Sequence, residues 1–177
     1  MQGFSKPGRI VLDPFSGAGT IPFEACLLGR NGIGFDISRM ATAVSNAKLN
    51  PPSRNKLNAF LRRLESSIAR GTPSPSEHSS ANDISFNRPV PEYFHEDTLK
   101  EILLARRFFL KNYDDSAEWH FAMTAMMHIL HGNRPYALSR RSHPVTPFAP
   151  TGPTEYKSVK DKLHQKINKG LATALPP

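Results

Sequence analysis

The order of apolar and polar positions divides the chain into a short α/β segment followed by a mainly helical part. Residues 9–13 are a short apolar run that ends in Asp13, the pattern of a buried strand, and residues 31–36 predict a second short strand. Helical patterns over 21–30 and 38–50 follow these two strands. Because parallel strands of one sheet are joined through a helix, residues 1–52 predict a βαβα unit of an α/β fold.

Residues 53–70 predict an amphipathic helix, because apolar residues recur on one face at helical spacing and arginines lie opposite. The apolar residues of this face are Leu57, Phe60, Leu61, Leu64 and Ile68. The next segment, residues 71–91, is polar and rich in proline and serine. This composition predicts a flexible linker.

Two further helices are predicted within residues 92–132, and they are expected to pack as a helical hairpin. Thr98 and Glu101 have the spacing of a capping box at the start of the first of them. Residues 133–177 predict a basic, proline-rich loop and a C-terminal helix that stops at Gly170.

The composition of the chain predicts a class of binding partner and a cellular compartment. The 177 residues carry a formal net charge of +8, which favours a polyanionic partner, nucleic acid ahead of an anionic membrane. Cys26 is the single cysteine, so an internal disulfide is excluded; its apolar helical surroundings predict a buried thiol. A reducing, cytoplasmic compartment is the default expectation. No run of about eighteen apolar residues is present, so no membrane span is expected.

The turn after the first predicted strand has the chemistry of a ligand site. Gly17 and Gly19 allow the backbone to approach a ligand closely, and a helix N-terminus follows at once. Asp13 and Asp36 would lie at the carboxyl ends of adjacent strands, where an acid can accept hydrogen bonds from a ribose diol. The third glycine of a dinucleotide-binding fingerprint and the Gly-Lys-Ser/Thr of a P-loop are both missing.

The string "DPFSGAGT", with an acid after the next strand, closely resembles motif I of the S-adenosylmethionine-dependent methyltransferases that modify exocyclic amines of nucleic-acid bases. The resemblance implies a partial Rossmann-like methyltransferase fold over residues 1–52, followed by a mainly helical insertion. It also implies S-adenosylmethionine as the cofactor. The target would be a DNA base, of the N4-cytosine or N6-adenine type.

Several site residues follow from this resemblance alone. Phe15, Gly17 and Gly19 would surround the methionine part of the cofactor. Asp36 would bind the ribose hydroxyls, and Ile37 would pack on the adenine.

Three more residues of the string complete the expected cofactor site. Asp13 would hold the turn or meet the amino group of the cofactor. Pro14 belongs to the same turn. Thr20 would cap the following helix or contact the cofactor.

The second motif of these enzymes, Asp/Asn/Ser-Pro-Pro-Tyr/Phe, is missing. In the enzymes of this family it receives the target amine and stacks on a flipped-out base. "NPPS" at residues 50–53 lacks the aromatic residue and follows a predicted helix, and the final "ALPP" lacks the polar and aromatic residues. No catalytic residue is therefore assigned. We expect this chain to be the cofactor-binding portion of a longer or split enzyme and to be inactive alone. In a split enzyme, a complementary chain would carry the catalytic motif.

The loop beyond the predicted hairpin supplies a candidate DNA contact. "ALSRRSHPVTPFAPTGPTEYK" resembles an insertion found in some prokaryotic DNA methylases. Arg140, Arg141, His143 and Lys157 would contact the phosphate backbone, and a solvated basic face is the competing interpretation.

Two other functions stay open at this point. "GAGTIPFEA" is similar to a string of RNA guanine-N2 methylases, and the chain could also be a catalytically inert nucleic-acid-binding remnant. No metal is expected, because no glutamate or cysteine completes a site with the helical residues His120, His128 and His131.

Overall fold

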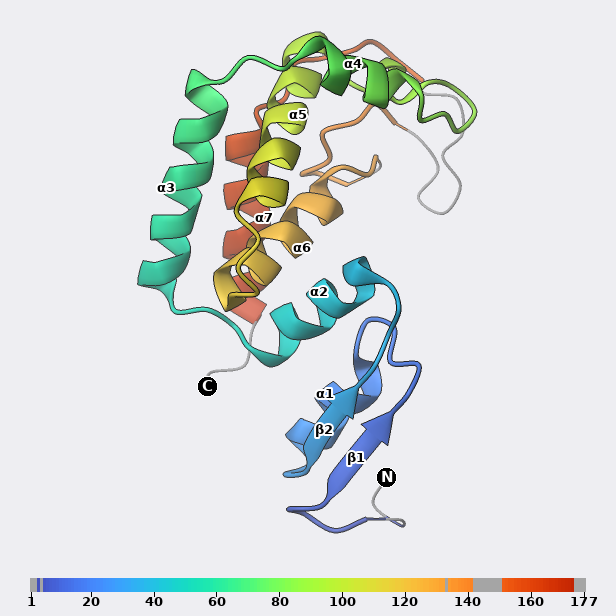
Figure 1. Cartoon of the computed structure of the whole chain (residues 1–177), viewed down its shortest axis with the longest axis vertical. Helices are drawn as coiled ribbons and strands as arrows, with labels where there is room; N and C mark the ends of the chain where they lie inside the picture. Colours follow the sequence, from blue (N-terminus) through green and yellow to red (C-terminus); the bar gives the residue numbers. More distant parts are fainter. Residues whose placement is uncertain (1–2, 4, 133, 142–150, 174–177) are drawn as a thin grey trace.

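The computed structural model describes residues 3, 5–132, 134–141 and 151–173. The described chain forms a small α/β unit and a larger helical unit, and one helix of the first unit, α2, packs against the second (Figure 1). The fold is mixed α/β with a two-stranded parallel sheet and is mostly helical.

The α/β unit confirms the predicted βαβα order. Its elements are β1 (Ile10–Asp13), α1 (Thr20–Leu27), β2 (Asn31–Gly34) and α2 (Arg39–Leu49). The strands are parallel, with Leu12 paired to Ile33. Ser38 is the N-cap of α2, and its side chain accepts a hydrogen bond from the backbone N–H of Ala41.

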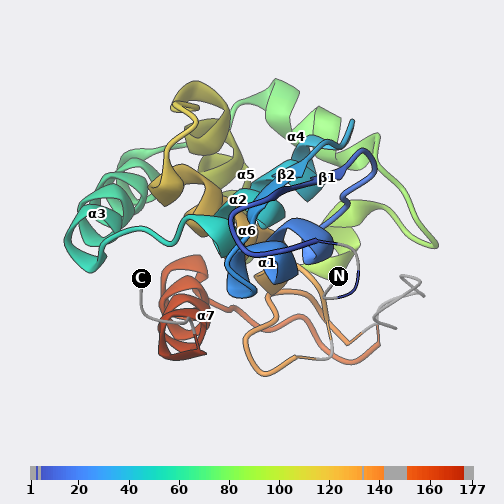
Figure 2. The ribbon, with the colours of Figure 1, turned by 90° about the horizontal axis from the view of Figure 1, so that it is seen from below.

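Helix α1 covers one face of this sheet at very short range (Figure 2). A Cβ placed on Gly32 would lie 2.5 Å from the carbonyl oxygen of Pro22, and one on Gly34 would lie 2.9 Å from the Pro22 ring. These two glycines of β2 therefore allow the helix to approach the strand. Pro22 itself is tolerated because it stands in the first turn of α1, as predicted.

The opposite face of the sheet is exposed. Ile10, Leu12, Ile33 and Phe35 share that face, since side chains alternate along each strand and paired residues point the same way. Strands of parallel sheets are ordinarily covered on both faces. Cys26 on α1 is also exposed, so the predicted burial of its thiol is wrong: this side of α1 is not packed against the described chain.

The described residues of the helical unit form six elements: α3 (Arg54–Arg70), α4 (Pro75–Asn82), the 3₁₀ helix η1 (Val90–Tyr93), α5 (Glu96–Lys111), α6 (Ala117–Ile129) and α7 (Val159–Thr173). Its core is built by α3, α5, α6 and α7 around Leu64, Phe109, Ile129 and Leu163. The amphipathic helix predicted over 53–70 is confirmed, with four of its five apolar residues buried.

The two helices predicted within 92–132 are present, but they do not pack along their length as a hairpin. Phe109 and Trp119 stack edge to face near the connecting turn, with ring centroids 5.9 Å apart. Beyond the turn, α6 packs mainly against α2, α7 and α3. The prediction missed this because the partner of α6 lies far away in the sequence.

The predicted helix boundaries fail at two other points. Gly170 does not stop the last helix, since α7 continues to Thr173. A Cβ on Gly170 would stand 3.4 Å from the ring of Phe121, so this glycine lies at a close approach of α7 to α6. The capping box expected at Thr98 is also wrong, because helix α5 begins earlier with His95 as its N-cap.

Thr98 instead holds the loop before α7. Its buried hydroxyl donates to the carbonyl oxygen of Lys157 at 3.0 Å and accepts from the backbone N–H of Lys157 at 2.9 Å. The capping-box pattern was misleading because this hydroxyl is used by a segment 59 residues away.

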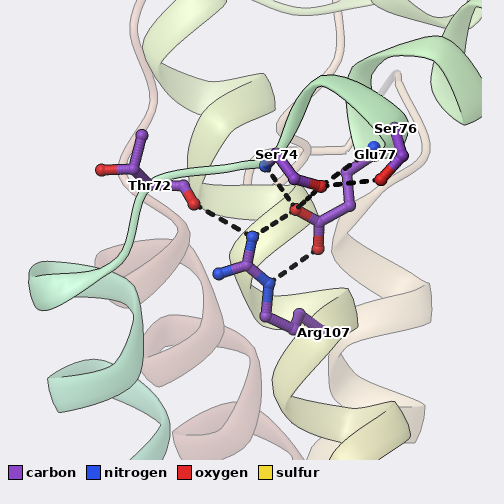
Figure 3. Close-up of polar contacts among 5 residues, drawn as sticks. All are labelled: Thr72, Ser74, Ser76, Glu77 and Arg107. Atoms are coloured by element: carbon purple, nitrogen blue, oxygen red, sulfur yellow. Dashed lines mark hydrogen bonds and ion pairs between the residues drawn. The ribbon is translucent and has the colours of Figure 1, made fainter.

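The segment expected to be a linker, residues 71–91, contains helix α4. Figure 3 shows how this helix is fixed: the Glu77 carboxylate receives the Arg107 guanidinium of α5, with Nε donating to Oε1 at 2.7 Å. Glu77 and Ser74 also form a complete capping box. Arg107 donates in addition to the carbonyl oxygen of Thr72. An irregular structure is therefore the wrong prediction for Pro75–Asn82.

The ion pair of Glu77 makes the stability of the helical unit depend on pH. The hydrogen bond from Arg107 is the main cause that lowers the pKa of the Glu77 carboxyl from 4.5 to about 2. A carboxyl with a lowered pKa in the folded state stabilises the fold above its unfolded pKa and loses this effect as the pH falls through the folded value. We predict that Glu77→Gln lowers the urea midpoint at pH 7. The difference from the parent chain should shrink as the pH falls from 4.5 toward 2, when measured by circular dichroism. A difference that stays constant over this range would contradict the prediction.

Candidate functional site

The carboxyl end of β1 is joined to α1 by a turn that two glycines shape. This turn, residues 14–19, has Gly17 at φ +51° and Gly19 at φ +74°. Both values lie in the left-handed region that non-glycine residues rarely adopt. Gly19 is also the N-cap of α1. The expected cap, Thr20, is instead the first helical residue, so the prediction that Thr20 caps the helix is wrong.

Asp36 ties this turn to the start of α2. Its Oδ2 accepts a hydrogen bond from the backbone N–H of Gly17 at 2.9 Å, and its Oδ1 accepts one from Ser38 at 2.8 Å. A carboxylate offers about four acceptor positions. Each oxygen of Asp36 therefore keeps the capacity for another donor. Asp36 lies two residues beyond the last residue of β2, Gly34, rather than on the strand itself.

Asp13 holds the other side of the turn. Its carboxylate accepts a hydrogen bond from the backbone N–H of Phe15 at 3.1 Å, and its carbonyl oxygen accepts one from Phe35 at 2.9 Å. The backbone N–H of Ser16 in turn donates to the carbonyl oxygen of Phe35. The exposed Pro14 lies between these contacts. Asp13 thus makes the turn-holding contact that was one of its two expected roles.

Two large apolar side chains flank the turn and Asp36 without being packed. Phe15 is 88% exposed, and Ile37 is 103% exposed relative to the reference residue. They stand immediately after Asp13–Pro14 and after Asp36 in the sequence. The site therefore combines backbone N–H groups, two carboxylates and apolar side chains at one edge of the sheet.

A lysine that sequence reasoning missed completes the support of the turn. Lys48, in the last turn of α2, donates from Nζ to the carbonyl oxygen of Ala18 at 2.8 Å. A Cβ on Gly19 would stand 2.1 Å from Oγ of Ser45, also on α2. No local sequence pattern predicts these contacts, because they depend on how α2 packs against the turn.

Next to the turn, α2 and α6 border an open, mostly apolar groove of about 320 Å³. Ala18 of the turn and Met40 and Val44 of α2 line one side, and Thr124 and His128 of α6 line the other. Burial lowers the pKa of His128, which favours its neutral form.

The predicted DNA contacts lie elsewhere. The loop 134–141 lies beside α6, across α2 from the sheet (Figure 1). There Arg140 donates to the carbonyl oxygen of Gly152, and Lys157 donates from Nζ to the carbonyl oxygen of Ser139. Burial lowers the pKa of Lys157. Arg141 is exposed, and His143 lies outside the described residues.

Other functional features are limited within the described chain. No group of three or more histidine, cysteine, aspartate or glutamate side chains that could hold a metal ion occurs in the described residues. His120 contacts Asp115, with 2.9 Å between Nε2 and Oδ1. No helix among the described residues is both long and apolar enough to span a membrane.

The geometry of the turn agrees with a match to a protein family. Residues 2–46 match the family model described as DNA methylase. The match covers β1, the turn, α1, β2 and most of α2, and it supports a DNA methyltransferase family. It does not reach α3–α7. No curated protein and no solved structure matches the chain.

The two glycines of the turn should respond differently to alanine. A Cβ on Gly17 would meet no atom within 4 Å, so only the left-handed backbone opposes Gly17→Ala, at about 1–2 kcal/mol. Gly19→Ala adds a clash with Ser45, so we predict a larger loss of about 2–5 kcal/mol. Urea unfolding followed by circular dichroism measures both. Equal losses would show that α2 does not press on the turn as the structure has it.

Proposed function

We propose that the chain is an S-adenosylmethionine-dependent DNA methyltransferase whose α/β unit binds the cofactor at the turn of residues 14–19 and at Asp36. One observation carries the proposal: the Asp36 carboxylate, beyond the carboxyl end of β2, holds the N–H groups of Gly17 and Ser38 and keeps acceptor capacity on both oxygens. The match of residues 2–46 to DNA methylases supports the same conclusion.

The residues of the turn suit this cofactor. Open space lies over Gly17, where a Cβ would meet nothing within 4 Å, so a ligand can approach the backbone there. Asp36 can accept hydrogen bonds from two ribose hydroxyls. The fully exposed Ile37 offers an apolar surface to an adenine, and Phe15 one to the methionine part. When bound, the cofactor supplies a methyl group on a positively charged sulfur.

The role of the chain itself is to bind and orient the cofactor. Lys48 and Ser45 hold the turn from α2, and Asp13 holds it from β1, so the ligand meets a preformed backbone. Preorganisation of this kind reduces the cost of ordering the site on binding.

The proposed target is an exocyclic amine of cytosine or adenine, which would receive the methyl group that the bound cofactor supplies and would release a proton. The chain has no Pro-Pro-aromatic tetrapeptide after a strand, so we propose that it is inactive alone and that a complementary chain orients the amine. The exposed apolar face of Ile10, Leu12, Ile33 and Phe35 supports such an additional layer.

Calorimetric titration with S-adenosylmethionine tests the proposal. We predict that Asp36→Ala weakens binding by at least about tenfold, since it removes the acceptors for the ribose and the support of Gly17. Asp36→Asn keeps the side-chain shape and should bind with intermediate affinity. The matched control is Asp83→Asn, an exposed aspartate at the end of α4.

The parent chain and all variants are checked for helix content by circular dichroism. A folded parent chain that does not bind S-adenosylmethionine would overturn the proposal. Equal binding by Asp36→Ala and Asp83→Asn would remove Asp36 from the site.

A further inference from the structure

A second hollow of the surface lies between α3 and α5, which run side by side at the edge of the molecule (Figure 1). We call it the α3–α5 groove; it has an open volume of about 640 Å³. On α3 it is lined by Ala59, Arg62, Arg63, Ser66 and Ser67. These positions recur at three- and four-residue spacing and therefore share one face of the helix.

The chemistry of the lining is cationic. Among the described residues that line the groove, two are arginines, two are serines and none carries a carboxylate. Glu65, the acid nearest to them in sequence, is engaged by α7: His164 contacts one of its oxygens at 2.6 Å, and Lys160 lies 3.3 Å from the other. No carboxylate of α3 therefore neutralises the two arginines.

Arg63 is held in position by neutral groups. Its Nη2 donates to Oδ1 of Asn112 at 3.0 Å, and its guanidinium carbon lies 5.8 Å from the ring centroid of Phe108. A guanidinium has five N–H donors, so most of them stay available for a ligand. Arg62 is exposed and makes no hydrogen bond or ion pair within the described chain.

Several other cations of the helical unit are already bound to protein oxygens. Arg107 pairs with Glu77, Arg140 donates to Gly152, and Lys157 donates to Ser139. The arginines of the groove are different, because a neutral amide is the only hydrogen-bond acceptor they have among the described residues.

We propose that the α3–α5 groove binds the phosphate backbone of nucleic acid. An open groove with two arginines, two hydroxyl groups and no acid suits a chain of phosphate oxygens, for which arginine is a bidentate donor. Anion binding by the groove follows from its own residues, whereas the choice of duplex DNA rests on the proposed function. The groove replaces the loop around Arg140 as the main backbone contact.

Fluorescence anisotropy of a labelled duplex of about 20 base pairs, titrated with the full chain over a range of salt, tests this proposal. Log affinity falls with log salt, and each lost phosphate contact reduces the magnitude of this negative slope by about 1. We predict that Arg62→Ala/Arg63→Ala weakens binding at least about tenfold and reduces the magnitude of the slope by about 2. Arg62→Lys/Arg63→Lys should retain part of the affinity, because the charges remain while the fork of donors is lost.

The matched control is Arg9→Ala/Arg88→Ala, which removes the same charge from two exposed arginines outside the groove. Arg141→Ala tests the predicted loop. Ser66→Asp places an acid in the groove without removing the contacts of Arg63, so it keeps the test valid if the double alanine variant does not fold. It should also weaken binding.

Three outcomes would overturn the proposal: no duplex binding by the parent chain, an unchanged salt slope in the groove variants, or an equal loss in the Arg9/Arg88 control. Titration of the groove variants with S-adenosylmethionine separates this proposal from the preceding one. Unchanged cofactor binding with lost DNA binding supports the groove, and DNA binding that survives in Asp36→Ala shows that the two sites fail independently.

Discussion

The packing of α2 between the glycine turn and α6 is the constraint on which the rest of the structure depends. Ala43 and Ala47 are buried on α2, and such small side chains allow helices to approach closely. Along its length the same helix supports the turn at three points. Asp36 and Ser38 act at its N-terminus, Ser45 lies against Gly19 in the middle, and Lys48 holds Ala18 near the end. Because α6 in turn holds α2, the helical unit determines where the candidate cofactor site lies.

The sheet shows why local patterns predicted the α/β unit but not its burial. An apolar run of four or five residues predicts a strand that is covered on both faces, and the parallel strands were predicted correctly. In the structure only one face is covered, because Gly32 and Gly34 allow α1 to approach there. Cys26 and the opposite face are exposed because no described element packs on them, and tertiary packing of this kind is not visible in a local pattern.

Much of the helical unit was predictable where the stabilising contacts are local, and less where they are distant. Helix α3 follows from the spacing of its apolar residues alone. Helix α4 was missed although Ser74 and Glu77 form a capping box, a local signal that the proline-rich composition concealed. Thr98 had the same type of signal and misled, because its hydroxyl binds Lys157 instead. A capping pattern therefore misleads when a distant segment binds the hydroxyl of the expected N-cap, as Lys157 does with Thr98.

The same distinction applies to charge. A net charge of +8 predicts a polyanionic partner but does not show which surface binds it, because every cation contributes equally to the net charge. The structure distinguishes these cations by the protein groups that their N–H donors already contact. The cations of the expected loop, Arg140 and Lys157, bind backbone carbonyl oxygens, and their positions are thereby explained by folding. Arg62 and Arg63 have no such acceptor beyond one amide, so their charges stay available to solvent and ligands where α3 meets α5.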